Sequence, residues 1–396
     1  MPPTRRPPWP SLTDAPPAAP RVLIAPDKFK GSLTAAAVAR AVGSGVRRVR
    51  TDAEVCEVPV ADGGDGTLAA AVAAGYVAVP VTVAGPTGEP VRTSYARRGA
   101  RAIVELADAC GLERLPGGQP APLSASSRGA GEVVAAAVRA GCRDVVLGIG
   151  GSASTDGGAG LLRGLGAAVR DAGGRDLPAG GAALSRVATI NLDPVRALLT
   201  GVRVTVACDV DNPLTGAQGA AAVYAPQKGA TPRQVAELDA ALGRWADVIG
   251  AATGTDLRDA QGAGAAGGVG YAARAVLGAT LRPGIDLVLD LIDFPTHLAG
   301  ADLVITGEGA LDTQTLRGKA PAGVAAAARV AGVPVVAVCG RTSLSERDLS
   351  RAGIVAAYPL TVLEPDLRRC LTHAAPLLEQ LGAHIAETRL AVIPGG

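Results

Sequence analysis

The sequence predicts an α/β fold built on a parallel sheet and divided into two domains. Short apolar runs typical of buried strands are each followed by a polar loop and a helical segment, an order that favours parallel sheets. Near Gly75 this order is replaced by runs in which apolar and polar residues alternate, and it returns near Asp302. The change indicates a second domain between these two positions. A chain of 396 residues is long enough to bury two cores.

The composition argues against several classes of partner. Aromatic residues make up 2% of the chain and the net charge is +2, so we expect neither a nucleic-acid surface nor a membrane-binding surface. The six cysteines form no C-x-x-C pair, and no secretory segment or long apolar stretch is found. We therefore predict a reduced, cytoplasmic protein. Residues 1–20 contain eight prolines and are predicted to form a disordered extension.

The first two strands are expected at residues 22–25 and 55–60, and each ends in a charged loop. Asp27 and Lys30 follow the first strand, before a helix capped by Ser32 or Thr34, and Lys30 is suited to bind an anion. The second strand runs into residues 61–67, ADGGDGT, whose two carboxylates could hold Mg²⁺, orient a hydroxyl or act as a base. Helix capping and an Asx turn are the structural alternative for this pair.

A glycine-rich loop follows the apolar strand at residues 145–147 and precedes a helical segment. Because glycine permits positive φ and close backbone approach, a strand, a glycine loop and a helix N-terminus together suit a phosphate group. The residues of this predicted cradle are Gly150, Gly151, Ser152, Ser154, Thr155, Asp156, Gly157 and Gly158. A tight turn is the alternative. The loose pattern Gly148-x-Gly150-x-x-Ala153 also leaves open a dinucleotide site.

The middle of the chain contributes further candidates. Residues 77–83 and 91–95 predict a hairpin, and residues 102–106 and 202–207 predict further strands. The last of these leads to Asp209 and Asp211, which suit a metal or hydroxyl site, although turn chemistry would also explain them. Lys228 is a second candidate for binding phosphate or carboxylate. Thr231 and Pro232 then begin a long helix.

The strand–loop–helix order returns with a strand at residues 302–306. The loop after it carries Glu308, Asp312 and Lys319, and leads to a helix at residues 321–331. A strand at residues 335–339 and a final helix from about residue 364 complete the parallel-sheet pattern. All three histidines lie outside these loops, so we do not expect a histidine base.

Seven of these segments, in this order, resemble the bacterial type-I glycerate kinase family. They are APDKFKGSL (25–33), PVADGGDGT (59–67), GIGGSASTDGGAG (148–160), ACDVDNPL (207–214), PQKGATP (226–232), GAGAAGG (262–268) and LVITGEGALDTQTLRGKAP (303–321). Four positions depart from the family pattern, which usually has Ser at Lys28, Glu at Asp65, Asn at Thr155 and Arg at Ala310.

The resemblance implies ATP-dependent phosphorylation of D-glycerate, generally at the 2-hydroxyl, by a monomer or homodimer. It also implies two α/β domains around a cleft. The first is a discontinuous Rossmann or flavodoxin-like parallel-sheet domain of residues 21–80 and 300–396, and the second a mixed-sheet domain of residues 81–299. Two alternatives stay open, an NAD-dependent oxidoreductase and a non-catalytic sugar-acid or nucleotide binder.

The resulting hypothesis gives each candidate residue a role. The loop from Gly150 to Gly158 holds the nucleotide phosphates. Mg²⁺ lies between Asp209 and Asp211, with Asp62 as a further candidate. Lys30 and Lys228 hold the glycerate carboxylate or the moving phosphoryl group. Asp209 takes the hydroxyl proton, with Glu308 as its competitor. The remaining substrate contacts are expected from Asp27, Asp62, Gly63, Gly64, Asp65, Asp312 and Lys319.

Overall fold

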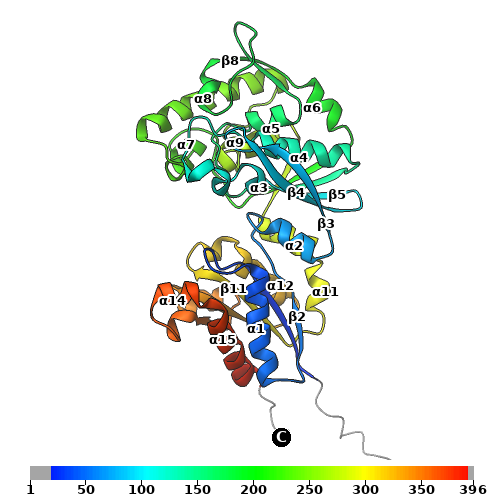
Figure 1. The fold of residues 1–396 in the computed structure, drawn as a ribbon, viewed down its shortest axis with the longest axis vertical. Coiled ribbons are helices and arrows are strands. Elements are labelled where there is room, and N and C mark those ends of the chain that lie inside the picture. The colour runs from blue at the N-terminus through cyan, green and yellow to red at the C-terminus, as the bar shows by residue number, and fades with distance from the viewer. Residues whose placement is uncertain (1–18, 391–396) are drawn as a thin grey trace, which may run out of the picture.

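The computed structural model describes residues 19–390, and the extension predicted for residues 1–20 lies almost entirely outside them. The chain forms two α/β domains, one around a parallel sheet and one around a mixed sheet (Figure 1). The predicted fold class is therefore confirmed. The domain boundaries near residues 80 and 300 stay a prediction.

The parallel sheet joins the two ends of the chain. Its strand order is β13-β12-β11-β1-β2, and every neighbouring pair is parallel. Val22 of β1 lies opposite Leu303 of β11 in this ladder. The strands are β1 (Arg21–Pro26), β2 (Glu54–Glu57), β11 (Leu303–Leu311), β12 (Val335–Thr342) and β13 (Ala356–Pro359).

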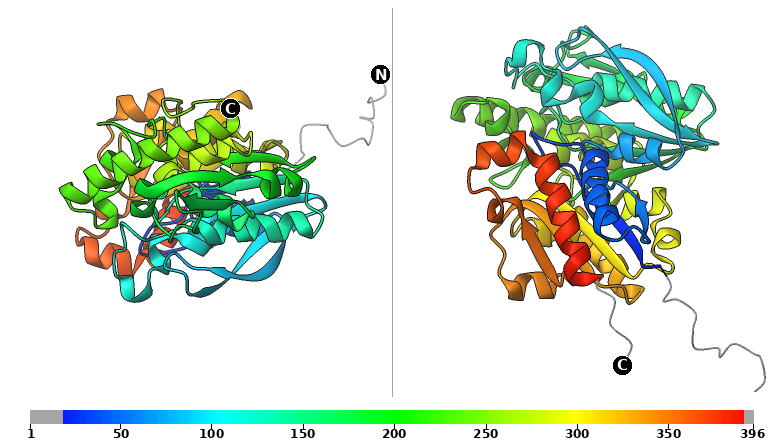
Figure 2. Two further views of the ribbon diagram at one scale, coloured as in Figure 1. Left: turned by 90° about the horizontal axis from the view of Figure 1, so that it is seen from above. Right: turned by 60° about the horizontal axis from the view of Figure 1, so that its bottom comes forward.

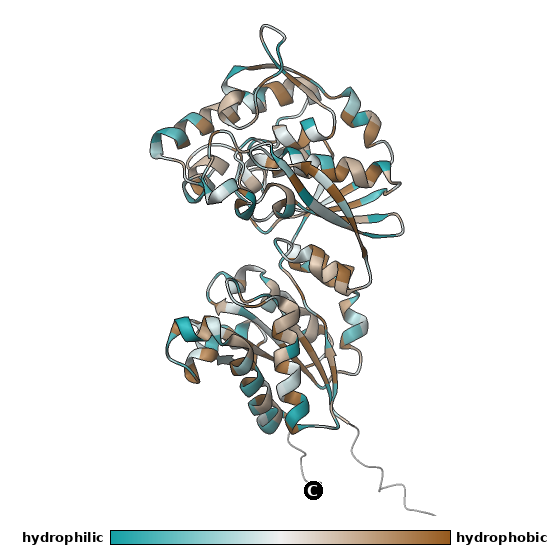
Figure 3. Cartoon of the chain, viewed as in Figure 1, coloured by the Kyte–Doolittle hydropathy of each residue, from teal (hydrophilic) through white to brown (hydrophobic). Residues whose placement is uncertain are grey.

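Both faces of this sheet are covered, which is why its inner strands β1, β11 and β12 are mostly apolar, whereas the edge strand β2 has the sequence EVCE. Val22 and Ile24 point towards α1 (Ala35–Val49) and α15 (Ala374–Arg389), which lie side by side (Figure 2). The alternate residues, among them Leu23, pack on the other face with α10 (Gly284–Leu291), α11 (Phe294–Leu298), α12 (Ala320–Val330) and α13 (Glu346–Arg351). In Figure 3 the helices of this domain carry both hydrophobic (brown) and hydrophilic (teal) residues, as is typical of helices with one buried face.

The mixed sheet has the order β10-β9-β6-β5-β4-β3. Strands β3 and β4 form the predicted antiparallel hairpin, whereas β5, β6, β9 and β10 run parallel to one another. The strands are β3 (Val77–Ala84), β4 (Pro90–Arg98), β5 (Arg101–Glu105), β6 (Asp144–Gly148), β9 (Arg203–Ala207) and β10 (Thr280–Arg282). A separate antiparallel pair consists of β7 (Ala168–Asp171) and β8 (Val187–Asn191).

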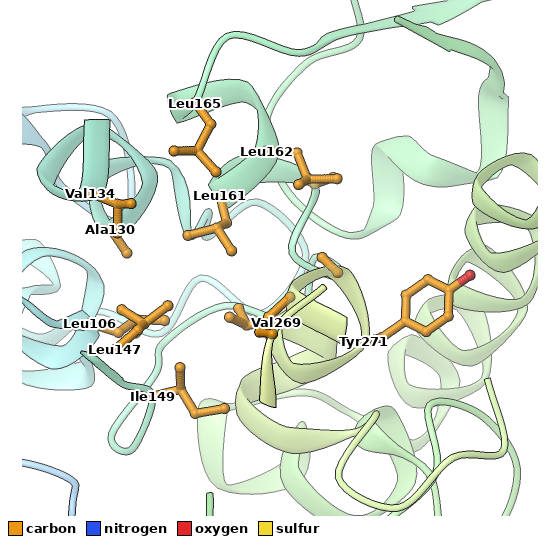
Figure 4. Close-up of a cluster of buried hydrophobic side chains, with 14 of the residues drawn as sticks. Leu106, Ala130, Val134, Leu147, Ile149, Leu161, Leu162, Leu165, Val269 and Tyr271 are labelled. Atoms are coloured by element: carbon orange, nitrogen blue, oxygen red, sulfur yellow. The ribbon is translucent and has the colours of Figure 1, made fainter. Parts of the chain in front are cut away.

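Helices from distant parts of the sequence build the larger core of this domain. Figure 4 shows Leu147 and Ile149 packed near Leu161 and Val269. The helices of the mixed-sheet domain that contribute to this core or border it are α3 (Leu106–Cys110), α4 (Arg128–Arg139), α5 (Ala159–Gly164), α6 (Asp193–Leu198), α7 (Ala220–Tyr224), α8 (Pro232–Thr253) and α9 (Ala265–Ala275). Helix α8 begins as predicted, with Thr231 in a capping box and Pro232 in its first turn.

The two domains meet through α2 (Thr67–Ala73) and α10. Leu287 and Leu291 of α10 pack with Ala71 of α2 against the mixed sheet, while Ile285 and Val288 of α10 belong to the core of the parallel-sheet domain. Helix α10 therefore contributes to both cores. In the described part of the chain, no helix has the length and apolar character needed to cross a membrane.

Several element boundaries differ from those predicted, three of them as follows. Strand β11 continues to Leu311 instead of ending before Gly307, because β12 is also longer and pairs with it as far as Thr342. Regular β2 ends at Glu57, since Pro59 has no N–H to donate. The predicted final helix is two helices, α14 (Leu367–Thr372) and α15.

Candidate functional site

A cleft of about 1020 Å³ lies at the carboxyl ends of β1, β11 and β12. Strand β1 leads to β2 on one side of the sheet, and β11 leads to β12 on the other, so the strand order reverses between β1 and β11. Ligands of open α/β sheets bind at such a switch point. The predicted site residues that line this cleft are Asp27, Lys30, Asp62, Gly64, Asp65, Gly150, Gly151, Glu308, Asp312 and Lys319.

Two buried carboxyl groups flank the switch point. Asp27 follows β1 and is 7% exposed, and its Oδ1 accepts a hydrogen bond of 2.6 Å from the Lys28 N–H. Burial, and then the charge of Asp62, raises the pKa of Asp27 to about 7. Glu308 lies within β11, where its carboxylate accepts a hydrogen bond from the Thr315 hydroxyl. Burial is also the main reason why the pKa of Glu308 is raised.

Asp62 is the common neighbour of the carboxyl groups at the site. Its charge helps to raise the pKa of Asp27, of Glu308 and of Asp209. Asp209 is exposed, yet desolvation by the surrounding protein is the largest effect that raises its pKa to about 6. Its Oδ1 accepts a hydrogen bond of 2.8 Å from the Gly284 N–H. The site is therefore rich in negative charge that a cation or a proton would relieve.

Cations face these carboxylates across the cleft. Lys28 pairs with Asp65, so two of the positions that depart from the family pattern pair with each other. Lys319 Nζ lies 4.0 Å from Glu308 Oε2. Lys30 is exposed in the cleft, as is Arg341 of β12, a residue that the sequence did not single out. Such an arrangement can bind an anion such as phosphate.

A smaller cavity of about 230 Å³ shares a wall with the cleft. The residues common to both include Asp62, Gly64, Gly150 and Gly151. The predicted site residues found in the smaller cavity alone are Gly63, Ser152, Asp209 and Lys228.

Lys228 is 3% exposed and donates a hydrogen bond to the Ser154 carbonyl. Burial lowers the pKa of Lys228 to about 8, although Asp156 opposes this effect. A buried lysine that can reach a small cavity is suited to hold a carboxylate there.

The later part of the predicted phosphate cradle has structural roles. Asp156 is buried, and its carboxylate accepts hydrogen bonds from the N–H groups of Ser127, at 2.8 Å, and of Gly158, at 3.2 Å. The Gly157 carbonyl accepts a hydrogen bond of 2.9 Å from the Trp245 indole. Ser154, Thr155, Asp156, Gly157 and Gly158 line neither cavity. Gly150, Gly151 and Ser152 are therefore the part of the loop that a ligand in these cavities would meet.

The fold does not place Asp211 beside the other candidate site residues. It is exposed and lines neither cavity, whereas Asp209, two residues earlier, lines the smaller one. The turn at Asn212 explains the separation, since its side chain donates to the Gln218 carbonyl and accepts from the Tyr224 hydroxyl at 2.6 Å.

Glu105 was missed by the sequence reasoning. It is 3% exposed at the end of β5, and its carboxylate accepts hydrogen bonds from the N–H groups of Gly66, at 2.9 Å, and Leu68, at 3.1 Å. It therefore caps α2, the role considered above for Asp65, and fixes the end of the loop that carries Asp62. A charged residue inside the apolar run at residues 102–106 was the available signal.

Ala266 was also missed. It lines the smaller cavity with a left-handed backbone, φ 52°, which is uncommon for a residue other than glycine. It belongs to GAGAAGG (262–268), one of the seven segments that carry the family resemblance, in which no site residue had been predicted.

Comparison with known proteins gives one consistent result. A model described as the glycerate kinase family matches residues 22–390. The chain is 42% identical over 370 residues to a glycerate kinase of Bacillus subtilis (strain 168), covering 92% of this chain and 97% of the relative. It is 41% identical over 341 residues to a glycerate 2-kinase of Escherichia coli (strain K12), covering 85% and 90%.

The structural comparison agrees. A crystal structure assigned to glycerate kinase 2 from Salmonella typhimurium LT2 superposes with a TM-score of 0.81 at 42% identity. The similarity covers 94% of this chain and 99% of that one, so it includes both sheets.

Proposed function

Because this chain belongs to the glycerate kinase family and is therefore a phosphotransferase, we propose that it transfers the γ-phosphoryl group of ATP to D-glycerate. The product that we propose is 2-phosphoglycerate, formed at the 2-hydroxyl. The relative named glycerate 2-kinase, 41% identical, supports this position. The comparisons favour phosphoryl transfer over the oxidoreductase and the non-catalytic binder that the sequence left open.

The observation that carries the proposal is the pair of cavities with a shared wall. Their volumes of about 1020 and 230 Å³ suit a nucleoside triphosphate beside a three-carbon acid. In this arrangement, ATP occupies the large cleft and glycerate the small cavity. The γ-phosphoryl group then passes between them at Asp62, Gly64 and Gly150, which border both spaces.

Each reactant has a cation suited to it. Lys228, buried at the small cavity, would hold the glycerate carboxylate, and Lys30 and Lys319 would hold phosphate oxygens in the cleft. Gly150 and Gly151 would present backbone N–H groups to the moving phosphoryl group. Phosphoryl transfer depends mainly on positioning and charge neutralisation, which these groups supply.

Asp209 is our candidate for the base. As the 2-hydroxyl oxygen attacks the γ-phosphorus and the bond to the ADP oxygen breaks, the hydroxyl proton passes to the Asp209 carboxylate. With its pKa raised to about 6, Asp209 is ionised at neutral pH yet more basic than an ordinary aspartate. Glu308 lines only the large cleft, which favours Asp209 for this role.

The residues also fit a Mg²⁺ ion that enters with ATP. Within residues 19–390 no three acidic, histidine or cysteine side chains form a ready metal site, but Mg²⁺ commonly uses one or two carboxylates together with water and phosphate oxygens. Asp62, which borders both cavities, would hold it, in place of the pair Asp209 and Asp211, and Asp209 would stay free to act as the base. The ion would neutralise charge on the phosphate oxygens.

A ³¹P NMR time course with ATP, Mg²⁺ and D-glycerate tests the function. We expect a 2-phosphoglycerate signal that grows as ATP falls. A 3-phosphoglycerate signal would overturn the position of transfer, and no transfer at all would overturn the function.

Asp209→Asn tests the base. It should lower kcat at least 100-fold without changing the melting temperature by more than about 2 °C. Asp211→Asn, two residues away and outside both cavities, is the matched comparison and should keep near-normal turnover. Equal losses of kcat in the two variants would indicate that Asp211 also acts in the site. Normal turnover of Asp209→Asn would show that Asp209 is not the base.

A further inference from the structure

One part of the lining of the large cleft is apolar. It is lined by Leu360, of the 3₁₀ turn Leu360–Val362, and by Leu367, Cys370 and Leu371 of α14. Leu367 is 48% and Leu371 51% exposed. Because they are four residues apart, the two leucines lie on the same side of the helix. Figure 1 shows α14 on the parallel-sheet domain, towards the mixed-sheet domain.

This apolar shelf, Leu367 and Leu371, is held in a defined position. Asp366 caps α14 by accepting a hydrogen bond of 2.8 Å from the Arg368 N–H. Ser32 donates a hydrogen bond from its hydroxyl to the Leu371 carbonyl. Ser32 belongs to the same turn as Lys30, so this hydrogen bond holds the shelf close to the backbone of Lys30.

The cleft combines linings of three kinds. The shelf is hydrogen-bonded to the turn that contains Lys30, Lys319 lies 4.0 Å from Glu308 at the switch point, and Asp62 also borders the small cavity. A nucleoside triphosphate has parts that match these linings, namely an apolar aromatic base, a chain of phosphates and the γ-phosphoryl group that reacts.

We propose that Leu367 and Leu371 form the subsite that binds the purine base of the nucleotide. This inference rests on the proposed function, because it takes ATP as the ligand of the cleft. Binding covers half-exposed leucine side chains with a planar, weakly hydrated ring, and removal of apolar surface from water favours the complex. The base then projects the phosphates towards Lys30.

Isothermal titration calorimetry with ATP and with inorganic tripolyphosphate separates base binding from phosphate binding. Leu367→Ser and Leu371→Ser should each raise the Kd for ATP about tenfold, a change of about 1.4 kcal/mol. The Kd for tripolyphosphate should stay within twofold of the wild-type value. Val362→Ser is the matched control, because Val362 is 76% exposed in the adjoining 3₁₀ turn but does not line the cleft.

The possible results distinguish failure of the base subsite from failure of the proposed function. Wild-type ATP affinity in both leucine variants overturns the base subsite and leaves the kinase in place. An equal loss of ATP and tripolyphosphate binding also overturns it, because the leucines would then act on the whole cleft. If the wild-type protein neither binds ATP nor transfers phosphate in the ³¹P experiment, the proposed function itself fails. Both leucines are exposed, so the serine variants are expected to fold, and circular dichroism checks this.

Discussion

Glutamine in place of Glu105 should stabilise the folded chain above pH 7, because the carboxylate that it replaces is almost completely buried between β5 and α2. Two effects compete at this residue. The hydrogen bonds from Gly66 and Leu68 favour the charged form, whereas burial and the charges of Asp108 and Asp65 disfavour it. Burial is the largest effect, and the pKa of Glu105 rises to about 7.

The magnitude follows from linkage between protonation and folding. A carboxyl group whose pKa is raised on folding stabilises the protein fully below its unfolded pKa, and this stabilisation is lost as the pH rises through the folded pKa. For Glu105 the interval runs from 4.5 to about 7. At about 1.36 kcal/mol per pH unit, the loss amounts to about 3 kcal/mol. Glutamine cannot ionise and resembles the protonated acid, so the variant should exceed the wild type in stability by less than about 1 kcal/mol at pH 5 and by about 3 kcal/mol at pH 8.

Urea unfolding, followed by circular dichroism at pH 5, 6, 7 and 8, measures this difference. Asp27 and Asp209 also have raised pKa values, but they are present in both proteins and cancel in the comparison. Glu113→Gln, an exposed carboxylate in the following 3₁₀ turn, should show no such pH-dependent gain. A Glu105→Gln variant that is less stable than the wild type at pH 8 would refute the reasoning, because the two hydrogen bonds would then outweigh burial.

Two further substitutions test the site and the junction between the domains. Lys228→Met should raise the KM for glycerate at least tenfold in steady-state assays without lowering the melting temperature at pH 7, because burial already disfavours the charged lysine; a lower melting temperature with an unchanged KM would contradict this. Gly63→Ala should cost about 2 kcal/mol more in unfolding free energy than Gly31→Ala. Both glycines have positive φ, but a Cβ at Gly63 would lie 2.4 Å from Gly284 Cα, whereas nothing lies within 4 Å at Gly31. Equal losses would show that this close approach carries no energetic cost.

The sequence predicted the parts of the fold that depend on local pattern. Alternating residues predicted the β3–β4 hairpin, and Thr231 with Pro232 predicted the start of α8. The charged loops after β1, β2 and β11 were also recognised as site candidates, because ligands of α/β folds bind beyond the carboxyl ends of strands.

The features that local sequence patterns did not predict depend on contacts between residues far apart in the sequence. Glycines and hydroxyls around Asp156 suit a phosphate cradle in isolation, but contacts with Ser127 and Trp245 place the end of that loop in the interior. Glu105 and Gly66 are far apart in the sequence, so no local pattern could reveal that one caps the helix after the other. The extra length of β11 likewise depends on β12.

The position of β1 between β2 and β11 also has a consequence for folding while the chain is being synthesised. Thr306 of β11 donates a side-chain hydrogen bond to the Ala25 carbonyl of β1, and the two residues are 281 positions apart. At about 5–20 residues per second, a ribosome needs roughly 15–55 s to make the intervening segment. During that time all strands of the mixed sheet emerge, from β3 to β10, while β1 still lacks its neighbour on one edge. The nascent chain must therefore shield an apolar strand edge until β11, near the start of the last quarter of the protein, has been made.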